Sequence, residues 1–318
     1  MSALQYNKVR LSDKCLFCKR TGKRKKNSNG EKDMANNAPI GVFDSGVGGL
    51  TVVKEIINQL PQEEIIYFGD TARVPYGSKS GETVRQYSRQ IADFLLSQGV
   101  KAIVIACNTA SAVALEMLQK ELPVPVIGVV RPGAKAAAQT TKSGRIGVIG
   151  TETTIRSSVY TEYLRKTDPH VVVYPKACPL FVSLVEEGWV NDDPITEQVA
   201  ERYLKVLKEK DIDTLVLGCT HYPLLRKTIA KIMGDSVALV NPAYETAHSL
   251  KYVLADYDLL HTQVGYEEVK KGEVPPFPQH KFYVSDGAEK FRNFASSILP
   301  CQIIEVGGVA IETLDNQK

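Results

Sequence analysis

The sequence lacks any apolar run long enough to cross a bilayer, which would need about 20 consecutive apolar residues. It also lacks the apolar segment near the N-terminus that is typical of a secretory signal. We therefore expect neither a membrane-spanning nor a secreted protein. The expected location is the cytoplasm, and no membrane partner is predicted.

The motifs of several common enzyme classes are also missing. There is no H-E-x-x-H, no G-x-S-x-G and no paired C-x-x-C set, so the sequence does not resemble zinc proteases, serine hydrolases or zinc fingers. The five histidines show no ligand spacing, and Cys15-x-x-Cys18 has no second ligand pair beside it. We therefore predict that the protein has no metal site.

The cysteines are few, and the net charge of the chain is small. Six scattered cysteines in 318 residues predict reduced thiols rather than a disulfide framework. The net charge of +3 divides into +7 for residues 1–33 and −4 for the remainder, so the globular part is mildly acidic and no nucleic-acid partner is expected. Residues 1–38 have no apolar periodicity, and we expect a disordered basic tail there.

From residue 39 onward, short apolar runs alternate with amphipathic stretches. Apolar residues recur at helical spacing over 82–98 and over 194–209. Strand–helix alternation of this kind predicts an α/β fold whose parallel sheets are covered on both faces. The expected strands are 40–43, 64–68, 102–106, 126–130, 146–149, 171–174, 214–217, 237–240, 281–284 and 302–306.

A weak internal repeat divides this region into two similar halves. Residues 40–45 resemble 146–151, and residues 102–109 resemble 214–220, at nearly equal offsets and in the same order. The repeat places one cysteine, Cys107 or Cys219, at the C-terminal end of a strand in each half. Ligands of open α/β sheets bind at that edge.

The first half contains three motifs that could carry chemistry. Asp44-Ser45-Gly-Val-Gly-Gly-Leu-Thr51 leads from a strand through a glycine-rich turn into a helix, a place where anions bind, although a simple helix cap explains it as well. The turn matches neither the dinucleotide fingerprint nor a P-loop. Cys107-Asn108-Thr109 combines a thiol at a helix start with polar donors. Gly69–Gly77 ends in Pro-Tyr76-Gly77, which we expect to present an aromatic ring and free amides on a loop.

The second half repeats the cysteine position and adds a histidine. In Gly-Cys219-Thr220-His221-Tyr-Pro223, the imidazole can tune the thiol or protonate a substrate group. Glu186 and Glu187 lie on an expected helix, and one of them could face the site. Cys178 and Cys301 have no polar neighbours of this kind in the sequence, so we expect them to be packing residues.

Taken together, these four ordered motifs resemble the glutamate racemases of the aspartate/glutamate racemase superfamily over roughly residues 38–310. The resemblance implies two similar doubly wound parallel-sheet domains that face each other across a cleft. It implies that 39–132 and 243–318 form the first domain and that 133–242 form the second, inserted domain. A homodimer is left as an open hypothesis.

The resemblance also implies roles for individual residues. Cys107 and Cys219 match the two catalytic cysteines, with Asp44 assisting Cys107. Cys219 would be assisted by His221 and by an acidic residue, for which Glu186 is the candidate. The implied function is cofactor-independent racemisation of glutamate, which supplies D-glutamate for the peptidoglycan precursor. The matching substrate contacts are Asp44, Ser45, Tyr76, Gly77, Asn108, Thr109, Thr220 and His221.

Elementary chemistry explains why such a reaction would need two thiols. Racemisation removes a proton from one face of Cα and returns one to the other face, so an acid and a base must stand opposite each other. A thiol with an ordinary pKa of about 8.5 can serve as either. Two rival readings remain open: a racemase of aspartate or a hydantoin, and a non-catalytic ligand-binding protein on the same scaffold. The presence of both cysteines argues against the second.

Overall fold

The computed structural model describes residues 36–190, 192–261, 278–303 and 305–315. Of the expected tail, residues 1–35 lie outside the described residues. Asn36 is buried, and its carbonyl oxygen accepts a hydrogen bond from Lys101 Nζ. The packed part of the chain therefore includes the last residues of the segment that was expected to be a tail.

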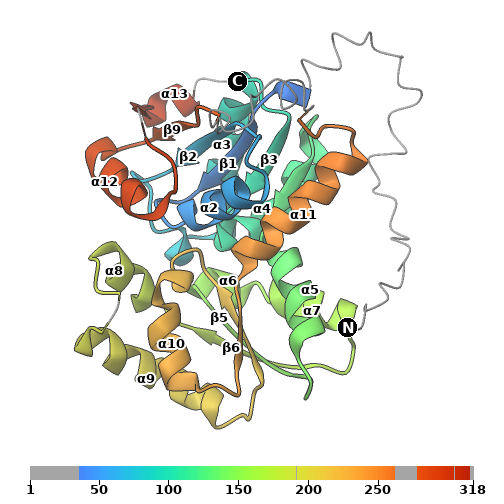
Figure 1. Cartoon of the computed structure of the whole chain (residues 1–318), viewed down its shortest axis with the longest axis vertical. Coiled ribbons are helices and arrows are strands. Elements are labelled where there is room, and N and C mark those ends of the chain that lie inside the picture. Colours follow the sequence, from blue (N-terminus) through green and yellow to red (C-terminus); the bar gives the residue numbers. More distant parts are fainter. Residues whose placement is uncertain (1–35, 191, 262–277, 304, 316–318) are drawn as a thin grey trace, which may run out of the picture.

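Two parallel sheets form the centre of the molecule, one above the other in Figure 1. The first sheet has the strand order β10-β9-β2-β1-β3-β4, and the second has the order β6-β5-β7-β8. Every pairing is parallel, as expected for short strands that are apolar on both faces. The strands are β1 (Ile40–Asp44), β2 (Ile65–Gly69), β3 (Ala102–Ile105), β4 (Val126–Gly128), β5 (Arg145–Gly150), β6 (Val172–Ala177), β7 (Thr214–Gly218), β8 (Ala238–Val240), β9 (Lys281–Val284) and β10 (Val306–Gly308).

Helices surround both sheets and bury their apolar faces on them. The two helices expected from periodicity are α3 and α9, each displaced by one residue or less at its ends. Short 3₁₀ turns occupy Tyr76–Ser78 and Tyr222–Leu225. The helices are α2 (Leu50–Gln59), α3 (Gly81–Ser97), α4 (Asn108–Glu121), α5 (Val130–Thr140), α6 (Glu152–Arg156), α7 (Val159–Thr167), α8 (Leu180–Glu186), α9 (Pro194–Lys208), α10 (Arg226–Met233), α11 (Pro242–Asp256), α12 (Ala288–Ile298) and α13 (Ile311–Asp315).

The predicted repeat is visible in the sheet topology. The order β2-β1-β3-β4 in the first sheet matches the order β6-β5-β7-β8 in the second. Cys107 follows β3 and Cys219 follows β7, so the two cysteines occupy equivalent places in the two sheets. The α/β fold with two similar parallel sheets is thus confirmed.

The chain passes between the sheets twice, through α5 on the way out and from β8 into α11 on the way back. These two helices lie side by side at the junction, where a Cβ on Gly133 would come within 2.9 Å of the Pro242 ring (Figure 1). After α11, the strands β9 and β10 extend the first sheet.

Two expected strands were placed partly wrongly. Of the described residues in the run at 302–306, only Val306 lies in a strand, where β10 begins, and Ile303 packs partly buried against the core ahead of it. The run at 126–130 ends as a strand at Gly128, because Val129 and Val130 form the start of α5. Val129 and Val130 are buried although they are helical, and periodicity cannot distinguish such residues from a buried strand.

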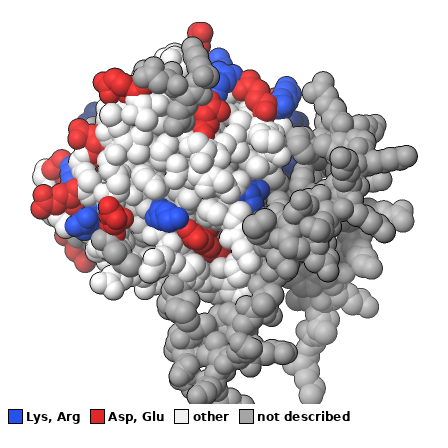
Figure 2. All heavy atoms as spheres, turned by 90° about the horizontal axis from the view of Figure 1, so that it is seen from above, with Lys and Arg blue, Asp and Glu red and all other residues white. Residues whose placement is uncertain are grey.

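Charged side chains on one face are shown in Figure 2. Over the described part of that face, Lys and Arg are interspersed with Asp and Glu and gather into no basic patch. Within the described chain, no helix is both long enough and apolar enough to cross a bilayer.

Candidate active site

The two cysteines line one cavity between the sheets. Both thiols are almost fully buried, and each follows the end of a strand in its own half. Cys107 caps α4, where its Sγ lies 3.5 Å from the amide of Ala110. The cavity is lined by Ser45, Val74, Pro75, Tyr76, Gly77, Cys107, Asn108, Thr109, Thr151, Val182, Cys219, Thr220 and His221.

Asp44 lies fully buried at the end of β1 and organises the glycine-rich turn. Its Oδ2 accepts hydrogen bonds from the amides of Gly49 at 2.8 Å and Gly46 at 3.2 Å. Its Oδ1 lies 3.5 Å from the hydroxyl of Thr220 in the other half. Burial raises the pKa of Asp44, although nearby His221 and the amide hydrogen bonds oppose that shift. The carboxylate therefore lies between the two cysteine-bearing segments rather than beside Cys107 alone.

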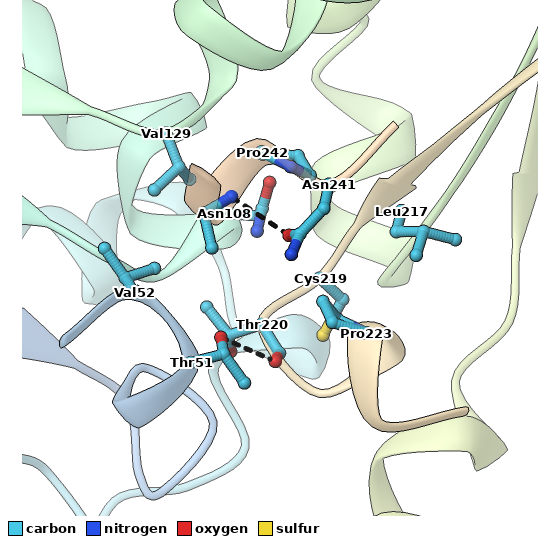
Figure 3. A pocket seen from close by; sticks show the side chains of 11 residues that line it. Thr51, Val52, Asn108, Val129, Leu217, Cys219, Thr220, Pro223, Asn241 and Pro242 are labelled. Carbon is cyan, nitrogen blue, oxygen red and sulfur yellow. Dashed lines mark hydrogen bonds between the residues drawn. The ribbon is translucent and has the colours of Figure 1, made fainter. Parts of the chain in front are cut away.

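The glycine-rich turn brings the two halves into direct contact. A Cβ on Gly48 would lie 2.4 Å from Thr220 Oγ1 and 2.6 Å from His221 Nδ1, so only glycine fits. Nearby, Thr51 Oγ1 donates a hydrogen bond to the Thr220 carbonyl at 3.2 Å (Figure 3). The turn therefore packs closely against the Cys219 segment.

This packing predicts that Gly48→Ala lowers kcat/KM by about 10²-fold, because a displacement of the Thr220–His221 segment misplaces reacting groups. Steady-state kinetics of the purified variant, in the glutamate racemisation expected from the sequence, would check this. The matched control is Gly308→Ala, where a Cβ would meet open space and the rate should stay at the wild-type level. A fully active Gly48→Ala variant would show that the contact is not needed.

Cys107 lies in surroundings that favour its protonated form. Burial raises its pKa to about 12, and the negative charge of Asp44 acts in the same direction. The hydrogen bonds with the Ala110 amide and with Ser45 Oγ, 3.7 Å from Sγ, only partly offset the shift. A protonated Cys107 is suited to donate a proton.

Cys219 has a different environment, in which a histidine and a carboxylate form a chain. Its Sγ lies 3.7 Å from His221 Nδ1, and His221 Nε2 lies 3.2 Å from Glu186 Oε1. Burial lowers the pKa of His221, but its hydrogen bonds with Cys219 and Glu186 and the charge of Asp44 raise it overall. The pKa of Glu186 is lowered: burial opposes this, and the hydrogen bond and charge of His221 outweigh it. The arrangement suits an imidazolium that stabilises a thiolate.

Polar side chains beside the cysteines close the cavity. The Oδ1 of Asn108 accepts a hydrogen bond from Tyr160 at 2.7 Å, which fixes the orientation of its amide. The hydroxyl of Thr109 lies 2.9 Å from that of Thr151 and 3.3 Å from that of Thr154. Neither Thr151 nor Thr154 lies in one of the four motifs. The repeat contained the signal for one of them, since residues 40–45 align with 146–151 and so place Thr151 opposite Ser45.

The expectation that the loop presents the Tyr76 ring is wrong. That ring is buried, and its hydroxyl donates a hydrogen bond to Asp70 Oδ2. Gly77 packs so closely on Thr151 that a Cβ would lie 2.6 Å from it, and Thr153 Oγ1 donates to the Gly77 carbonyl at 2.9 Å. Pro75, Tyr76 and Gly77 nevertheless line the cavity.

A second small cavity adjoins Cys219 and Thr220 at the junction of the halves (Figure 3). Thr51, Asn108, Asn241 and Pro242 contribute to its walls. The remaining described cysteines lie elsewhere: Cys178 is buried in the apolar core of the second half, and Cys301 is partly buried against the core of the first. In the described part of the chain, no three His, Cys, Asp or Glu side chains converge as metal ligands do.

Comparison with known proteins gives consistent results. The profile of the Asp/Glu/Hydantoin racemase family matches residues 40–250. A glutamate racemase from Geobacter metallireducens is 50% identical over 273 residues, which cover 86% of this chain and 97% of the relative. The structure of the isoform RacE1 glutamate racemase from Bacillus anthracis superposes with a TM-score of 0.80 at 42% identity, covering 87% of this chain and 98% of that one.

A third relative was solved with an amino acid bound. The glutamate racemase of Francisella tularensis, in complex with D-glutamate, superposes with a TM-score of 0.78 at 41% identity and covers 87% of this chain and 99% of its own. Two parallel sheets that contribute one cysteine each to a shared cavity, and matches over most of the chain, lead to one assignment. The chain belongs to the Asp/Glu/Hydantoin racemase family and groups with its glutamate racemases.

Proposed function

We propose that the protein interconverts L- and D-glutamate by a two-base proton transfer in which Cys107 and Cys219 act from opposite faces of Cα. The observation that carries the proposal is that two buried thiols, one from each half, line the same cavity. In one direction the Cys219 thiolate takes the α-proton and becomes a thiol, while the Cys107 thiol gives its proton to the opposite face and becomes a thiolate. The reverse direction exchanges the roles.

The difference between the two thiols supports this assignment of roles. Burial and Asp44 hold Cys107 as a thiol, whereas Cys219 lies beside a histidine whose pKa is raised. These surroundings support Cys107 as the proton donor and Cys219, beside the cationic form of His221, as its partner on the other side. Once a turnover has moved the proton, the two thiols have exchanged protonation states, and proton exchange with solvent or a reverse turnover restores them.

Removing an α-proton also places negative charge on the substrate carboxylate, which the protein must stabilise. The 14-residue helix α4 begins at Asn108, directly after Cys107, and its N-terminus is electropositive. Asn108, Thr109, Thr151 and Thr220 add polar groups around the cavity. Donors fixed in a closed site stabilise developing charge better than water does, because they need not reorient. This supports catalysis without a pyridoxal or metal cofactor.

Glutamate is the substrate we propose, because the relatives of 45–50% identity are glutamate racemases. Aspartate and hydantoin racemases remain the alternatives within the family. The proposed role, supply of D-glutamate for the peptidoglycan precursor in the cytoplasm, rests on the family resemblance.

The test uses purified protein, dialysed against a chelator and treated with an aldehyde trap, and then given L-glutamate in D₂O. We expect loss of optical rotation together with incorporation of deuterium at Cα, at the rate of untreated protein. L-Aspartate in the same assay should react far more slowly. A large loss of rate that added metal or pyridoxal phosphate restores would contradict the thiol mechanism, and equal rates on aspartate would contradict the substrate.

A further inference from the structure

Asp70 is a buried carboxylate that does not line the cavity, but it bonds to the turn Pro75–Gly77, which does line it. Asp70 follows β2 and is fully buried. Its Oδ2 accepts hydrogen bonds from Arg73 Nε at 2.7 Å and from the Tyr76 hydroxyl, and its Oδ1 accepts one from Ser285 Oγ at 2.9 Å. Both carboxylate oxygens are therefore used, by donors from two distant parts of the sequence.

The donors around Asp70 are themselves fixed. The guanidinium of Arg73 lies 4.0 Å from the centre of the Tyr87 ring, and its Nη1 donates to Gln90 Oε1 at 2.6 Å. Ser285 Oγ, just beyond β9, also accepts a hydrogen bond from the Ala72 amide at 2.9 Å. Charge-assisted hydrogen bonds of this kind are stronger than neutral ones and hold their partners in one geometry.

Tyr76 links this network to the cavity. Its ring is buried beside Tyr87, with the ring centres 5.7 Å apart, and Tyr76 lines the cavity together with its neighbours Pro75 and Gly77. Burial, together with the charge of Asp70, raises the pKa of the Tyr76 hydroxyl well above its usual value, so the hydroxyl stays a donor. The network thus fixes the turn through side chains of the first half. Thr153, from the second half, donates a hydrogen bond to the Gly77 carbonyl of the same turn.

We propose that Asp70 is a positioning residue: by holding Tyr76 it fixes the Pro75–Gly77 backbone against Thr151 and so sets the affinity for the substrate. The inference rests on the proposed function, since it concerns the turn expected to contact glutamate. It assigns to Asp70 no part in proton transfer, because neither Asp70 nor Arg73 lines the cavity.

The first experiment compares Asp70→Asn, Tyr76→Phe and the double variant, with KM and kcat for glutamate and binding of glutamate by calorimetry. An amide in place of the carboxylate removes the negative charge that strengthens the hydrogen bonds from Arg73 and Tyr76, and its NH2 group cannot accept the hydrogen bond from Ser285. A buried donor that loses its acceptor is costly. We expect KM and the dissociation constant to rise about tenfold in Asp70→Asn, with kcat changed by less than about threefold. Because Asp70 acts through Tyr76, the double variant should be no worse than Asp70→Asn.

The matched control is Asp213→Asn. Asp213 is also a carboxylate that holds a turn, accepting from Thr141 Oγ1 at 2.6 Å and from the amides of Lys142 at 2.7 Å and Ser143 at 2.6 Å. That turn lines neither cavity. We expect Asp213→Asn to lower the denaturation midpoint and leave KM unchanged.

The outcomes separate the positioning role from general destabilisation. The inference fails if Asp70→Asn leaves KM unchanged, if the effects of the two single changes multiply, or if Asp213→Asn raises KM as much. Should Asp70→Asn not fold, Tyr76→Phe and Ser285→Ala each remove one donor, and a KM at the wild-type value in both would overturn it. Wild-type protein that neither turns over nor binds glutamate would instead refute the proposed function, and this inference with it.

Discussion

Replacing either Cys107 or Cys219 with alanine is expected to lower the rate of racemisation by at least about 10³-fold, as loss of an acid–base group does. Each variant keeps one thiol on one face of Cα and has no group to protonate the other face. Circular dichroism of the glutamate pool would measure the rate. Because the two enantiomers have equal free energies, kcat/KM must fall by the same factor in both directions.

Deuterium exchange distinguishes the two variants although their racemisation rates do not. The remaining cysteine, in its deprotonated form, can still remove the α-proton of the one enantiomer whose hydrogen faces it, and return a deuteron to the same face. Cys107→Ala and Cys219→Ala should thus exchange opposite enantiomers, with retention of configuration. This follows from the placement of the cysteines in the two facing halves. Exchange of the same enantiomer by both variants would show that the thiols do not oppose each other.

A matched control exists in the same half as Cys219. Cys178 is equally buried, its pKa is raised to about 12 mainly by burial, and it does not line the cavity. Cys178→Ala should racemise glutamate at close to the wild-type rate. If it were as inactive as the other two variants, loss of a buried thiol rather than loss of a catalytic group would explain the result.

The sequence predicts the architecture and the placement of the cysteines for a physical reason. Strands that are buried on both faces appear as short apolar runs, and the C-terminal ends of parallel strands meet at one edge of a sheet. Once the repeat was recognised, Cys107 and Cys219 had to lie at equivalent edges, and both line the cavity. Strand ends near residues 126–130 and 302–306 were less predictable, because burial alone does not require extended backbone.

The sequence does not predict contacts that depend on how the two halves meet. The buried ring of Tyr76 depends on Asp70 and on Ser285, which lies more than 200 residues further along the chain. The approach of Gly48 to Thr220 and His221 depends on the packing of one half on the other. The sequence has two adjacent glutamates, Glu186 and Glu187, and does not by itself show which one faces the site. In the structure Glu186 lies 3.2 Å from His221, whereas Glu187 is exposed.

Glu186 and His221 give the second large effect. Replacing His221 with asparagine removes the imidazolium that faces Cys219 at 3.7 Å, and we expect kcat/KM to fall by at least about 10²-fold. The exchange experiment should show where the loss arises: proton removal by Cys219 slows strongly, while proton removal by Cys107 on the other face is less affected. A His221→Asn variant that slows exchange of both enantiomers equally would show that the histidine does not act through Cys219.

The carboxylate of Glu186 adds a pH dependence whose sign is fixed by the geometry. Glu186, Cys219 and Asp44 together raise the pKa of His221, so the imidazolium persists to a higher pH than a free histidine allows. Glu186→Gln keeps the shape and removes one negative charge, so the pKa of His221 falls and the same proton is lost at lower pH. We expect the alkaline limb of the kcat/KM profile to move by about one pH unit toward acid, with activity at lower pH little changed. Glu187→Gln, one residue along the chain, should leave the pH of the alkaline limb unchanged. An equal shift in that variant would mean that net charge near the site, rather than the contact with His221, determines the pH at which activity is lost.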